Sequence, residues 1–169
     1  MSTSLLVLGG ARSGKSRYAQ QRAEALHGRH VFIATAQAWD DEMRDRVTRH
    51  QADRGAIWLT VETPLELSAE IERWQGSGAV LLIDCLTLWA TNLLLGEHDI
   101  DAATSGLCRE IGLFDGTIIL VANEVGLGIV PDNALARAFR DVAGTINQVV
   151  AQTVHEVVFV AAGLPLKLK

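Results

Sequence analysis

A glycine-rich segment near the start of the chain carries the residues best suited to chemistry. It reads Gly9-Gly10-Ala11-Arg12-Ser13-Gly14-Lys15-Ser16 and matches G-x-x-x-x-G-K-[ST], a phosphate-binding pattern. Its glycines let the backbone turn tightly and aim successive N–H groups at phosphate oxygens. Lys15 is expected to reach the β- and γ-phosphates, and the hydroxyl of Ser16 to hold Mg²⁺. The segment predicts a site for a nucleoside triphosphate.

The sequence on either side of this segment supports that chemistry. The apolar run Leu5–Leu8 comes directly before the glycines, and the run Arg17–Leu26 has the composition of a helix. A helix that begins there would point its positive end at the phosphates. A chance glycine-rich turn is the alternative, and it would not need both a strand before it and a helix after it.

The rest of the chain alternates strand-like and helix-like patterns, which is typical of an α/β fold with a mostly parallel sheet and helices on both faces. The expected strands are Ser4–Leu8, Val31–Thr35, Ile57–Val61, Ala79–Asp84, Thr117–Ala122, Glu156–Ala161 and Leu164–Leu168. The expected helices are Arg17–Leu26, Asp40–Ala52, Pro64–Trp74 with Thr63 as its cap, Cys85–Leu95, Asp101–Leu113 and Asn133–Val154. We predict one P-loop nucleotide triphosphatase domain over residues 1–169.

Composition narrows the class of protein. The chain has 169 residues, 49% of them hydrophobic, and a net charge of −5, which argues against a nucleic-acid surface. The two cysteines, Cys85 and Cys108, are too few for a disulfide framework, so we expect reduced thiols. The N-terminal apolar run is too short for a signal peptide, and no run is long enough to span a membrane. We expect a cytoplasmic protein without a nucleic-acid partner.

Two carboxylates lie where expected strands end, at the edge of the sheet that binds ligands in such folds. Asp84 ends an apolar strand, as the carboxylate of a Walker B site does when it holds Mg²⁺. It could instead cap the helix that begins near Cys85, although the upstream phosphate loop favours the metal role. Glu62 follows another strand and is either a solvated carboxylate or a contact to the ribose or base of the nucleotide.

Two further segments are candidates for function. The loop Asn123–Pro131 puts two glycines and a polar pair after a buried strand, and we assign it to the acceptor substrate or a neighbouring subunit. An ordinary glycine-containing connection would also explain it. His50 shares a helical stripe with Arg46 and Arg54, which could neutralise a phosphate delivered to its imidazole. A solvated helix face explains this stripe as well.

Several segments together resemble one known family over essentially the whole chain. They are Gly9–Arg17, Ile33–Gln37, Asp40–Met43, Arg49-His50, Asn123–Pro131 and Arg137–Gln148. In this order they are similar to the bifunctional adenosylcobinamide kinase/adenosylcobinamide-phosphate guanylyltransferase family. Two positions depart from some members: Arg49 stands where they carry a second histidine, and Asp84 where they carry glutamate.

The resemblance implies a RecA-like P-loop fold, a homotrimer and two reactions in the synthesis and salvage of adenosylcobalamin. First, ATP or GTP phosphorylates the terminal hydroxyl of the aminopropanol arm of adenosylcobinamide. Then GMP passes from GTP to that phosphate through a guanylylated histidine, which yields adenosylcobinamide-GDP and pyrophosphate.

The resemblance also implies roles for individual residues. The guanylylated histidine corresponds to His50, which together with Lys15 forms the expected catalytic set. The nucleotide contacts correspond to Gly9, Gly10, Ala11, Arg12, Ser13, Gly14, Lys15, Ser16, Ala34, Thr35, Ala36, Gln51, Ala52, Asp53, Arg54, Glu62 and Asp84, of which Ser16 and Asp84 hold Mg²⁺.

Three other functions use a similar loop. A plain small-molecule kinase would form its product without releasing pyrophosphate. A RecA-like motor would hydrolyse ATP faster with DNA or RNA present, which the acidic balance disfavours. A GTP-binding switch would need a base-selective motif, and the sequence contains no N-K-x-D.

Overall fold

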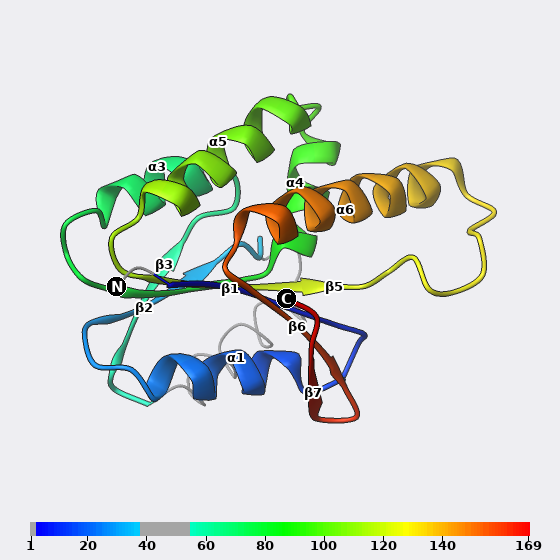
Figure 1. The fold of residues 1–169 in the computed structure, drawn as a ribbon. Helices are drawn as coiled ribbons and strands as arrows, with labels where there is room; N and C mark the ends of the chain where they lie inside the picture. Colours follow the sequence, from blue (N-terminus) through cyan, green and yellow to red (C-terminus); the bar gives the residue numbers. More distant parts are fainter. Residues whose placement is uncertain (1–2, 38–54) are drawn as a thin grey trace.

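A seven-stranded sheet runs through the middle of the computed structural model, which describes residues 3–37 and 55–169 (Figure 1). Its strand order is β3-β2-β4-β5-β1-β6-β7. The strands are β1 (Thr3–Gly9), β2 (His30–Ala34), β3 (Trp58–Glu62), β4 (Val80–Asp84), β5 (Thr117–Asn123), β6 (Glu156–Ala161) and β7 (Leu164–Lys167). Neighbouring strands are parallel except β6 and β7, which are antiparallel. The prediction of a mostly parallel sheet is confirmed.

Helices cover both faces of this sheet, as predicted (Figure 1). They are α1 (Lys15–Glu24), α3 (Leu67–Arg73), α4 (Leu86–Leu95), α5 (Ile100–Leu113) and α6 (Ala134–Thr153). Figure 1 shows α1 on one face and α3, α4, α5 and α6 on the opposite face. The helix expected over 40–52 lies outside the described residues. None of the described helices is long and apolar enough to cross a membrane.

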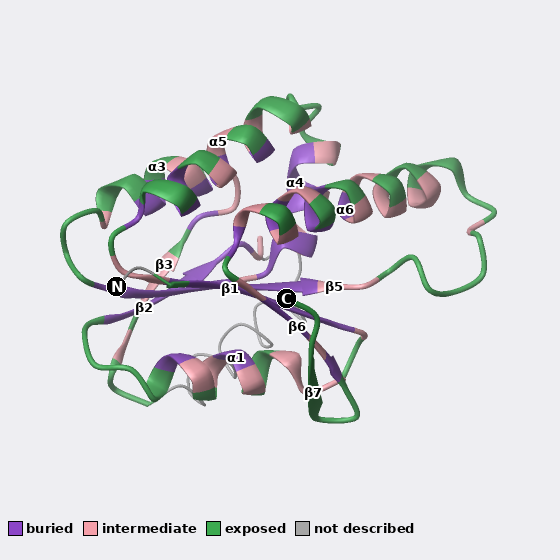
Figure 2. Ribbon diagram, in the orientation of Figure 1, coloured by how far each residue is buried: buried purple, intermediate pink, exposed green. Residues whose placement is uncertain are grey.

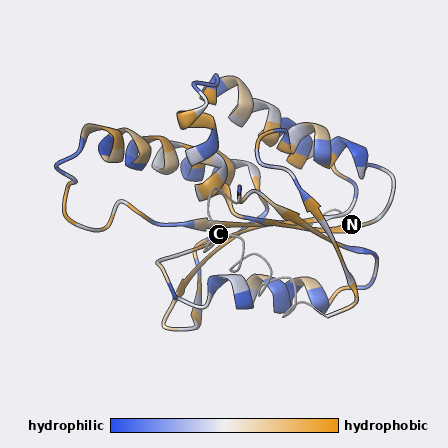
Figure 3. Cartoon of the chain, turned by 180° about the vertical axis from the view of Figure 1, so that it is seen from behind, coloured by the Kyte–Doolittle hydropathy of each residue, from blue (hydrophilic) through white to orange (hydrophobic). Residues whose placement is uncertain are grey.

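The core consists of two apolar layers, one on each face of the sheet. Alternate residues of a strand face opposite sides, so Leu6 and Leu81 pack with Trp89 beneath α4, while Val7 and Leu82 pack against α1. The inner strands are therefore apolar along almost their whole length, as strands covered on both faces must be. Figure 2 shows these strands as buried, and Figure 3 shows them as hydrophobic next to the mixed surfaces of the helices.

The start of α3 differs from the prediction. The helix begins at Leu67 rather than at Pro64, and Thr63 does not cap it. Thr63 instead continues the extended path of β3, because its N–H donates to the carbonyl oxygen of Ala34 in β2 at 2.8 Å. A threonine followed by proline is compatible with the start of a helix and with the end of a strand. The hydrogen bond of Thr63 to β2 shows that here it ends the strand.

An ion pair fastens α1 to the sheet. The guanidinium of Arg22 donates to both carboxylate oxygens of Glu156, at 3.1 and 2.9 Å, and a further bond runs from Arg22 to the Tyr18 hydroxyl at 2.8 Å. Such two-pronged pairs are stronger than single contacts. The hydrogen bonds from Arg22 lower the pKa of Glu156 below its ordinary value of 4.5.

This pair predicts an acid-dependent stability. Because the pKa of Glu156 is lower in the folded chain, the stabilisation is complete above the unfolded pKa and disappears as the pH falls through the folded value. We expect Glu156→Gln to lower the free energy of unfolding by up to about 1 kcal/mol at neutral pH, since the pair is partly exposed. The difference in the free energy of unfolding between Glu156→Gln and the unmodified protein should disappear in acid, as measured by urea unfolding over a pH series. Glu72→Gln, which removes a charge from an exposed position of α3, is the control. A difference in the free energy of unfolding that stays constant in acid would contradict this account.

Candidate nucleotide site

The glycine-rich segment forms a loop between β1 and α1, as the phosphate-binding pattern requires. Gly9 is the last residue of β1 and Lys15 the first of α1. Gly14, at the N-cap, has a φ of 94°, a left-handed conformation that glycine adopts without steric cost. The first turn of α1 contains no acidic side chain, so its positive end is open to an anion.

Gly9 sits where no side chain fits. A Cβ atom there would lie 2.5 Å from Ser13 Oγ and 2.6 Å from the carbonyl oxygen of Val160 in β6. The loop is also tied to the β6–β7 turn, because the N–H of Gly163 donates to the carbonyl oxygen of Ser13 at 2.7 Å. The sheet therefore holds the loop close to β6, and the missing side chain makes that approach possible.

Lys15 folds back over the loop. Its ammonium group donates to the carbonyl oxygen of Gly10 at 3.2 Å and is partly buried. This places a positive charge inside the turn, where phosphates would bind. Ser16 lies in the first turn of α1 and is exposed, as are Arg12 and Arg17 on either side of the turn.

Asp84 lies at the same edge of the sheet as this loop. It ends β4, one strand away from β1, with β5 between them. Leu82, two residues earlier, packs against α1, so Asp84 belongs to the face that α1 and the loop occupy. A serine hydroxyl and one carboxylate are oxygen donors of the kind that Mg²⁺ uses together with phosphate oxygens. The donor set of Ser16 and Asp84 thus fits Mg²⁺.

The alternative role of Asp84 as a helix cap does not hold. The N-cap of α4 is Cys85, whose sulfur accepts from the N–H of Leu88 at 3.5 Å. Burial, and next the charge of Asp84, raise the pKa of the Cys85 thiol to about 11, so it stays protonated and unreactive at neutral pH. Cys85 and Cys108 are both free, as predicted.

Thr35 connects the ends of β2 and β4. Its buried hydroxyl donates to the carbonyl oxygen of Cys85 at 2.7 Å and accepts from the N–H of Cys85 at 2.8 Å. Asn92 adds a bond from α4 to the carbonyl oxygen of Thr35 at 2.8 Å. The hydroxyl of Thr35 is therefore engaged in holding Asp84's strand in place. The nucleotide contact expected of Ala34, Thr35 and Ala36 stays a prediction.

The remaining predicted contacts are divided between the edge of the sheet and the undescribed segment. Glu62 ends the edge strand β3, opposite Ala34, and is exposed. His50 and the nucleotide contacts Gln51, Ala52, Asp53 and Arg54 lie outside the described residues. The structure thus brings the loop Gly9–Ser16 and Asp84 together and leaves Glu62 further along the same edge.

A polar cluster that sequence reasoning did not resolve sits beside the loop. Asn147 in α6 donates from its amide to the carbonyl oxygen of Asn123 and to Oε1 of Glu124, both at 3.3 Å. The N–H of Glu124 donates to the carbonyl oxygen of Gly9 at 3.1 Å. The sequence signal for this cluster is weak: a single asparagine on the otherwise apolar buried side of α6.

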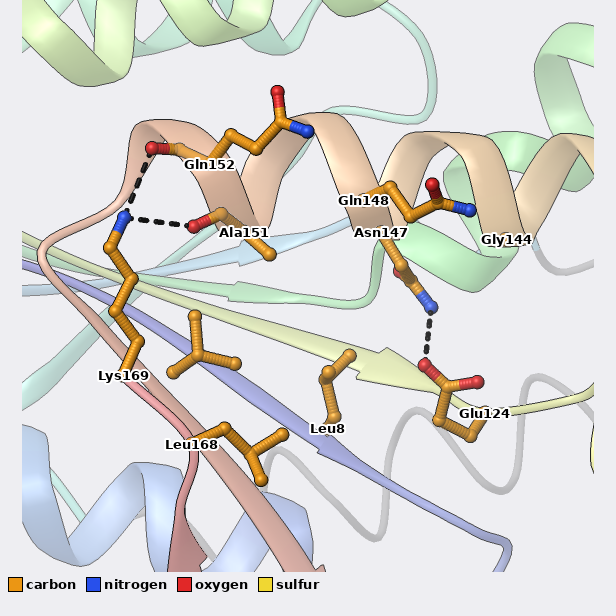
Figure 4. Close-up of a pocket in the computed structure, with 10 residues that line it drawn as sticks. Leu8, Glu124, Gly144, Asn147, Gln148, Ala151, Gln152, Leu168 and Lys169 are labelled. Carbon is orange, nitrogen blue, oxygen red and sulfur yellow. Dashed lines mark hydrogen bonds between the residues drawn. The ribbon is translucent and has the colours of Figure 1, made fainter.

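A cleft of about 700 Å³ opens beneath α6, with Glu124 and Lys169 among the residues that line it (Figure 4). The ammonium of Lys169 donates to the carbonyl oxygens of Ala151, Gln152 and Val154 and so caps the end of α6. The cleft lies on the α6 face of the sheet, whereas the loop's helix and Asp84 are on the α1 face. The cleft is therefore distinct from the phosphate site.

This combination of fold and loop defines a P-loop nucleotide triphosphatase. Solved structures agree on the fold. The flagellar accessory protein FlaH of Methanocaldococcus jannaschii is 12% identical, with a TM-score of 0.56 over 99% of this chain and 78% of its own. An ATPase from the type III secretion system of pathogenic bacteria is 11% identical, with a TM-score of 0.61 over 98% of this chain and 56% of its own.

Sequence relatives identify the family. Residues 5–168 match the family described as cobinamide kinase / cobinamide phosphate guanyltransferase, and the chain belongs to that family of bifunctional enzymes. The bifunctional adenosylcobalamin biosynthesis protein CobP of Pseudomonas aeruginosa is 47% identical over 97% of this chain and 96% of its own length. The bifunctional adenosylcobalamin biosynthesis protein CobU of Escherichia coli is 40% identical over 98% of this chain and 99% of its own length.

The packing around Gly9 predicts a sharp contrast between two adjacent glycines. Gly9→Ala should lower the free energy of unfolding by about 1–3 kcal/mol, because its Cβ would meet the fixed carbonyl oxygen of Val160. Gly10→Ala is the control, since its Cβ would meet nothing within 4 Å. Calorimetry of the nucleotide-free protein measures both, at about 2–4 °C for each kcal/mol. Equal melting temperatures for the two variants would contradict the geometry.

Proposed function

We propose that this chain catalyses two successive reactions on a corrinoid substrate. In the first, ATP or GTP phosphorylates the terminal hydroxyl of the aminopropanol arm of adenosylcobinamide. In the second, GMP is transferred from GTP to that phosphate, which yields adenosylcobinamide-GDP and pyrophosphate, in adenosylcobalamin biosynthesis and salvage. The observation that carries the proposal is a well-formed phosphate loop in a chain that matches this bifunctional family from end to end.

The kinase step relies on positioning and charge neutralisation, because phosphoryl transfer needs little covalent help from the protein. The amides of the loop Gly9–Ser16 bind the phosphates, and Lys15 stabilises the charge on the transferring group. Ser16 and Asp84 hold Mg²⁺, which neutralises charge on the phosphate oxygens when it is bound.

The guanylyl step uses His50 as the nucleophile. A ring nitrogen of the neutral imidazole forms a bond to the α-phosphorus of GTP, and pyrophosphate leaves with the electron pair of the broken bond. A phosphate oxygen of adenosylcobinamide phosphate then attacks the same phosphorus and releases the histidine. An imidazole is competent near neutral pH because its unperturbed pKa is about 6.5. We assign the contacts to the nucleotide in this step to Ala34–Ala36, Gln51–Arg54 and Glu62.

One pair of variants separates the two reactions. Lys15→Ala should abolish phosphorylation of adenosylcobinamide, because it removes a charge from the transition state. His50→Ala should retain phosphorylation but lose guanylyl transfer and the covalent GMP adduct formed from GTP labelled at the α-phosphate. A phosphoramidate adduct should survive alkali, be lost in mild acid, and form more slowly below about pH 6, where the imidazole is protonated.

Gel analysis of the labelled protein and chromatography of the corrinoid products measure both reactions. An acid-labile adduct on His50→Ala would mean that another residue is the nucleophile. Normal phosphorylation by folded Lys15→Ala would contradict the assignment of the loop.

We also propose that the chain is a single domain that assembles as a homotrimer and needs no nucleic acid. Three apolar side chains in and beside the loop Asn123–Pro131 support an interface there: Leu127 is 78% exposed, Ile129 97% and Leu135 54%. Exposed apolar groups of this kind mark contact surfaces. Light scattering should give the mass of three chains, and Ile129→Glu should shift that mass towards the monomer. Only monomers at working concentrations would contradict the proposal.

A further inference from the structure

The cleft beneath α6 has the composition of a site for an organic ligand. Its volume of about 700 Å³ is typical of pockets that bind small molecules. Leu8 of β1, Val157 of β6 and Leu168 after β7 give it an apolar floor. Gln148 on α6 and Glu124 after β5 add polar groups to its lining (Figure 4). In such sites the apolar surface supplies affinity, and a few polar groups fix the orientation of the ligand.

A glycine in the middle of α6 keeps one wall of this cleft open. Gly144 lines the cleft, and a Cβ atom there would meet nothing within 4 Å in residues 3–37 and 55–169. Glycine in a helix interior destabilises the helix relative to alanine. At Gly106 in α5, in contrast, a Cβ atom would lie 3.0 Å from Ser68 Oγ, so packing explains that glycine. Packing within the described residues does not explain Gly144, whose missing side chain leaves space for a ligand.

Two hydrogen bonds fix the surroundings of the cleft relative to the phosphate loop. The N–H of Glu124, which lines the cleft, donates to the carbonyl oxygen of Gly9 at 3.1 Å. The N–H of Gly163, in the β6–β7 turn, donates to the carbonyl oxygen of Ser13 at 2.7 Å. Leu8 of the cleft floor directly precedes Gly9. A ligand in the cleft therefore lies one strand end away from the loop, although on the other face of the sheet.

The apolar floor of the cleft continues onto the β6–β7 hairpin. Phe159 is two residues after Val157, so it faces the same side of the sheet, and so does Leu166, its ladder partner in β7. Figure 2 shows β7 as exposed, and Leu166 is 61% and Leu168 57% exposed. Exposed apolar surface of this kind marks a contact site. The cleft and the hairpin together offer a broad apolar surface, which fits a large, flat ligand.

The substrate of the proposed kinase step has the matching chemistry. A corrinoid is a broad, flat macrocycle with apolar faces and primary amides around its edge. The side-chain amides of Gln148 and Gln152, which both line the cleft, can donate to such groups and accept from them. The carboxylate of Glu124 can accept from an amide N–H in a charge-assisted hydrogen bond. The lining thus complements both the faces and the edge of the macrocycle.

We propose that the cleft beneath α6 binds the corrin ring of adenosylcobinamide, with the aminopropanol arm passing the end of β1 towards the phosphate loop; this rests on the kinase step proposed above. The ring lies against Leu8, Val157 and Leu168, and its amides bond to Gln148 and Gln152. The cleft supplies binding energy remote from the reacting atoms, while the loop carries out the transfer.

Gly144→Leu tests the proposal, because it fills the cleft from α6 without a close contact for its Cβ atom. The KM and the Kd for adenosylcobinamide should rise at least about 10-fold, while kcat stays within about threefold, since the ring is remote from the reacting atoms. The Kd for ATP should stay within about twofold, because the phosphate loop lies apart from the cleft. The melting temperature should hold or rise by about 2–4 °C, since leucine is a better helix former than glycine.

Gly112→Leu is the matched control. Gly112 also lies in a helix and has nothing within 4 Å of its Cβ position among the described residues, but it is near the end of α5 and does not line the cleft. Its KM for adenosylcobinamide should stay within about twofold of the unmodified value. Gln148→Met, which retains the size of the side chain but removes its amide, should raise the KM about fivefold at an unchanged melting temperature. This variant tests the proposal if Gly144→Leu does not fold.

Three results would overturn the inference. The first is a KM and a Kd for adenosylcobinamide that stay within about twofold in Gly144→Leu or, if that variant does not fold, in Gln148→Met. The second is an equal loss in Gly112→Leu, which would assign the effect to the helices in general. The third is a change of mass in light scattering of Gly144→Leu, which would assign the cleft to another copy of the chain. If the unmodified protein does not phosphorylate adenosylcobinamide, the proposed function itself is contradicted.

Discussion

The close approach of the phosphate loop to β6 is the constraint on which the site depends. At Gly9 the backbone comes so near the carbonyl oxygen of Val160 that even a methyl group would collide with it. Because the turn is this tight, Lys15 can fold back onto the carbonyl oxygen of Gly10, and α1 can begin directly beneath the sheet edge. The positive end of that helix and the lysine charge are then fixed at one place before any nucleotide binds.

Hydrogen bonds from buried polar side chains fix the ends of the neighbouring strands relative to the loop. Thr35 joins the end of β2 to the residue after Asp84, and Asn147 joins α6 to the end of β5. Each of these hydrogen bonds is made where a parallel strand leaves the sheet, so each helps to fix the direction in which the following segment departs. The apolar layers hold the sheet and helices together, while these few hydrogen bonds set the relative positions of the loop, Asp84 and Asn123.

Sequence patterns predicted the strands, the order of the helices among the described residues and the phosphate loop because each of these is local. The apolar runs, the glycine spacing and the helix after it require no knowledge of distant residues. The start of α3 was predicted wrongly because Thr63 and Pro64 resemble a helix start, and only the pairing of Thr63 with Ala34 shows that the strand continues. The sequence also did not determine which residue caps α4, because Asp84 and Cys85 are adjacent. Only the folded backbone shows that the sulfur of Cys85 caps the helix.

The site could be predicted only where a motif contained it. Lys15 and Ser16 follow from the spacing of the loop, whereas the bond between Asn147 and Asn123 joins residues that are far apart in the chain. The side-chain oxygen of Asn123 is buried and finds no hydrogen-bond partner among the described residues, and no sequence pattern indicates this, since it reflects the burial of one atom in the folded chain. The roles of His50 and of Gln51–Arg54 rest on family resemblance and stay predictions.

The most direct test of the account is the order in which phosphorus species appear when the unmodified protein acts on adenosylcobinamide with ATP, GTP and Mg²⁺. Phosphorus NMR should show a corrinoid phosphate monoester first. The two coupled signals of a corrinoid-bound diphosphate should follow, together with free pyrophosphate. A corrinoid that gains no phosphorus, or a diphosphate that forms without a preceding monoester, would contradict the central claim that one P-loop enzyme phosphorylates the corrinoid and then guanylylates it.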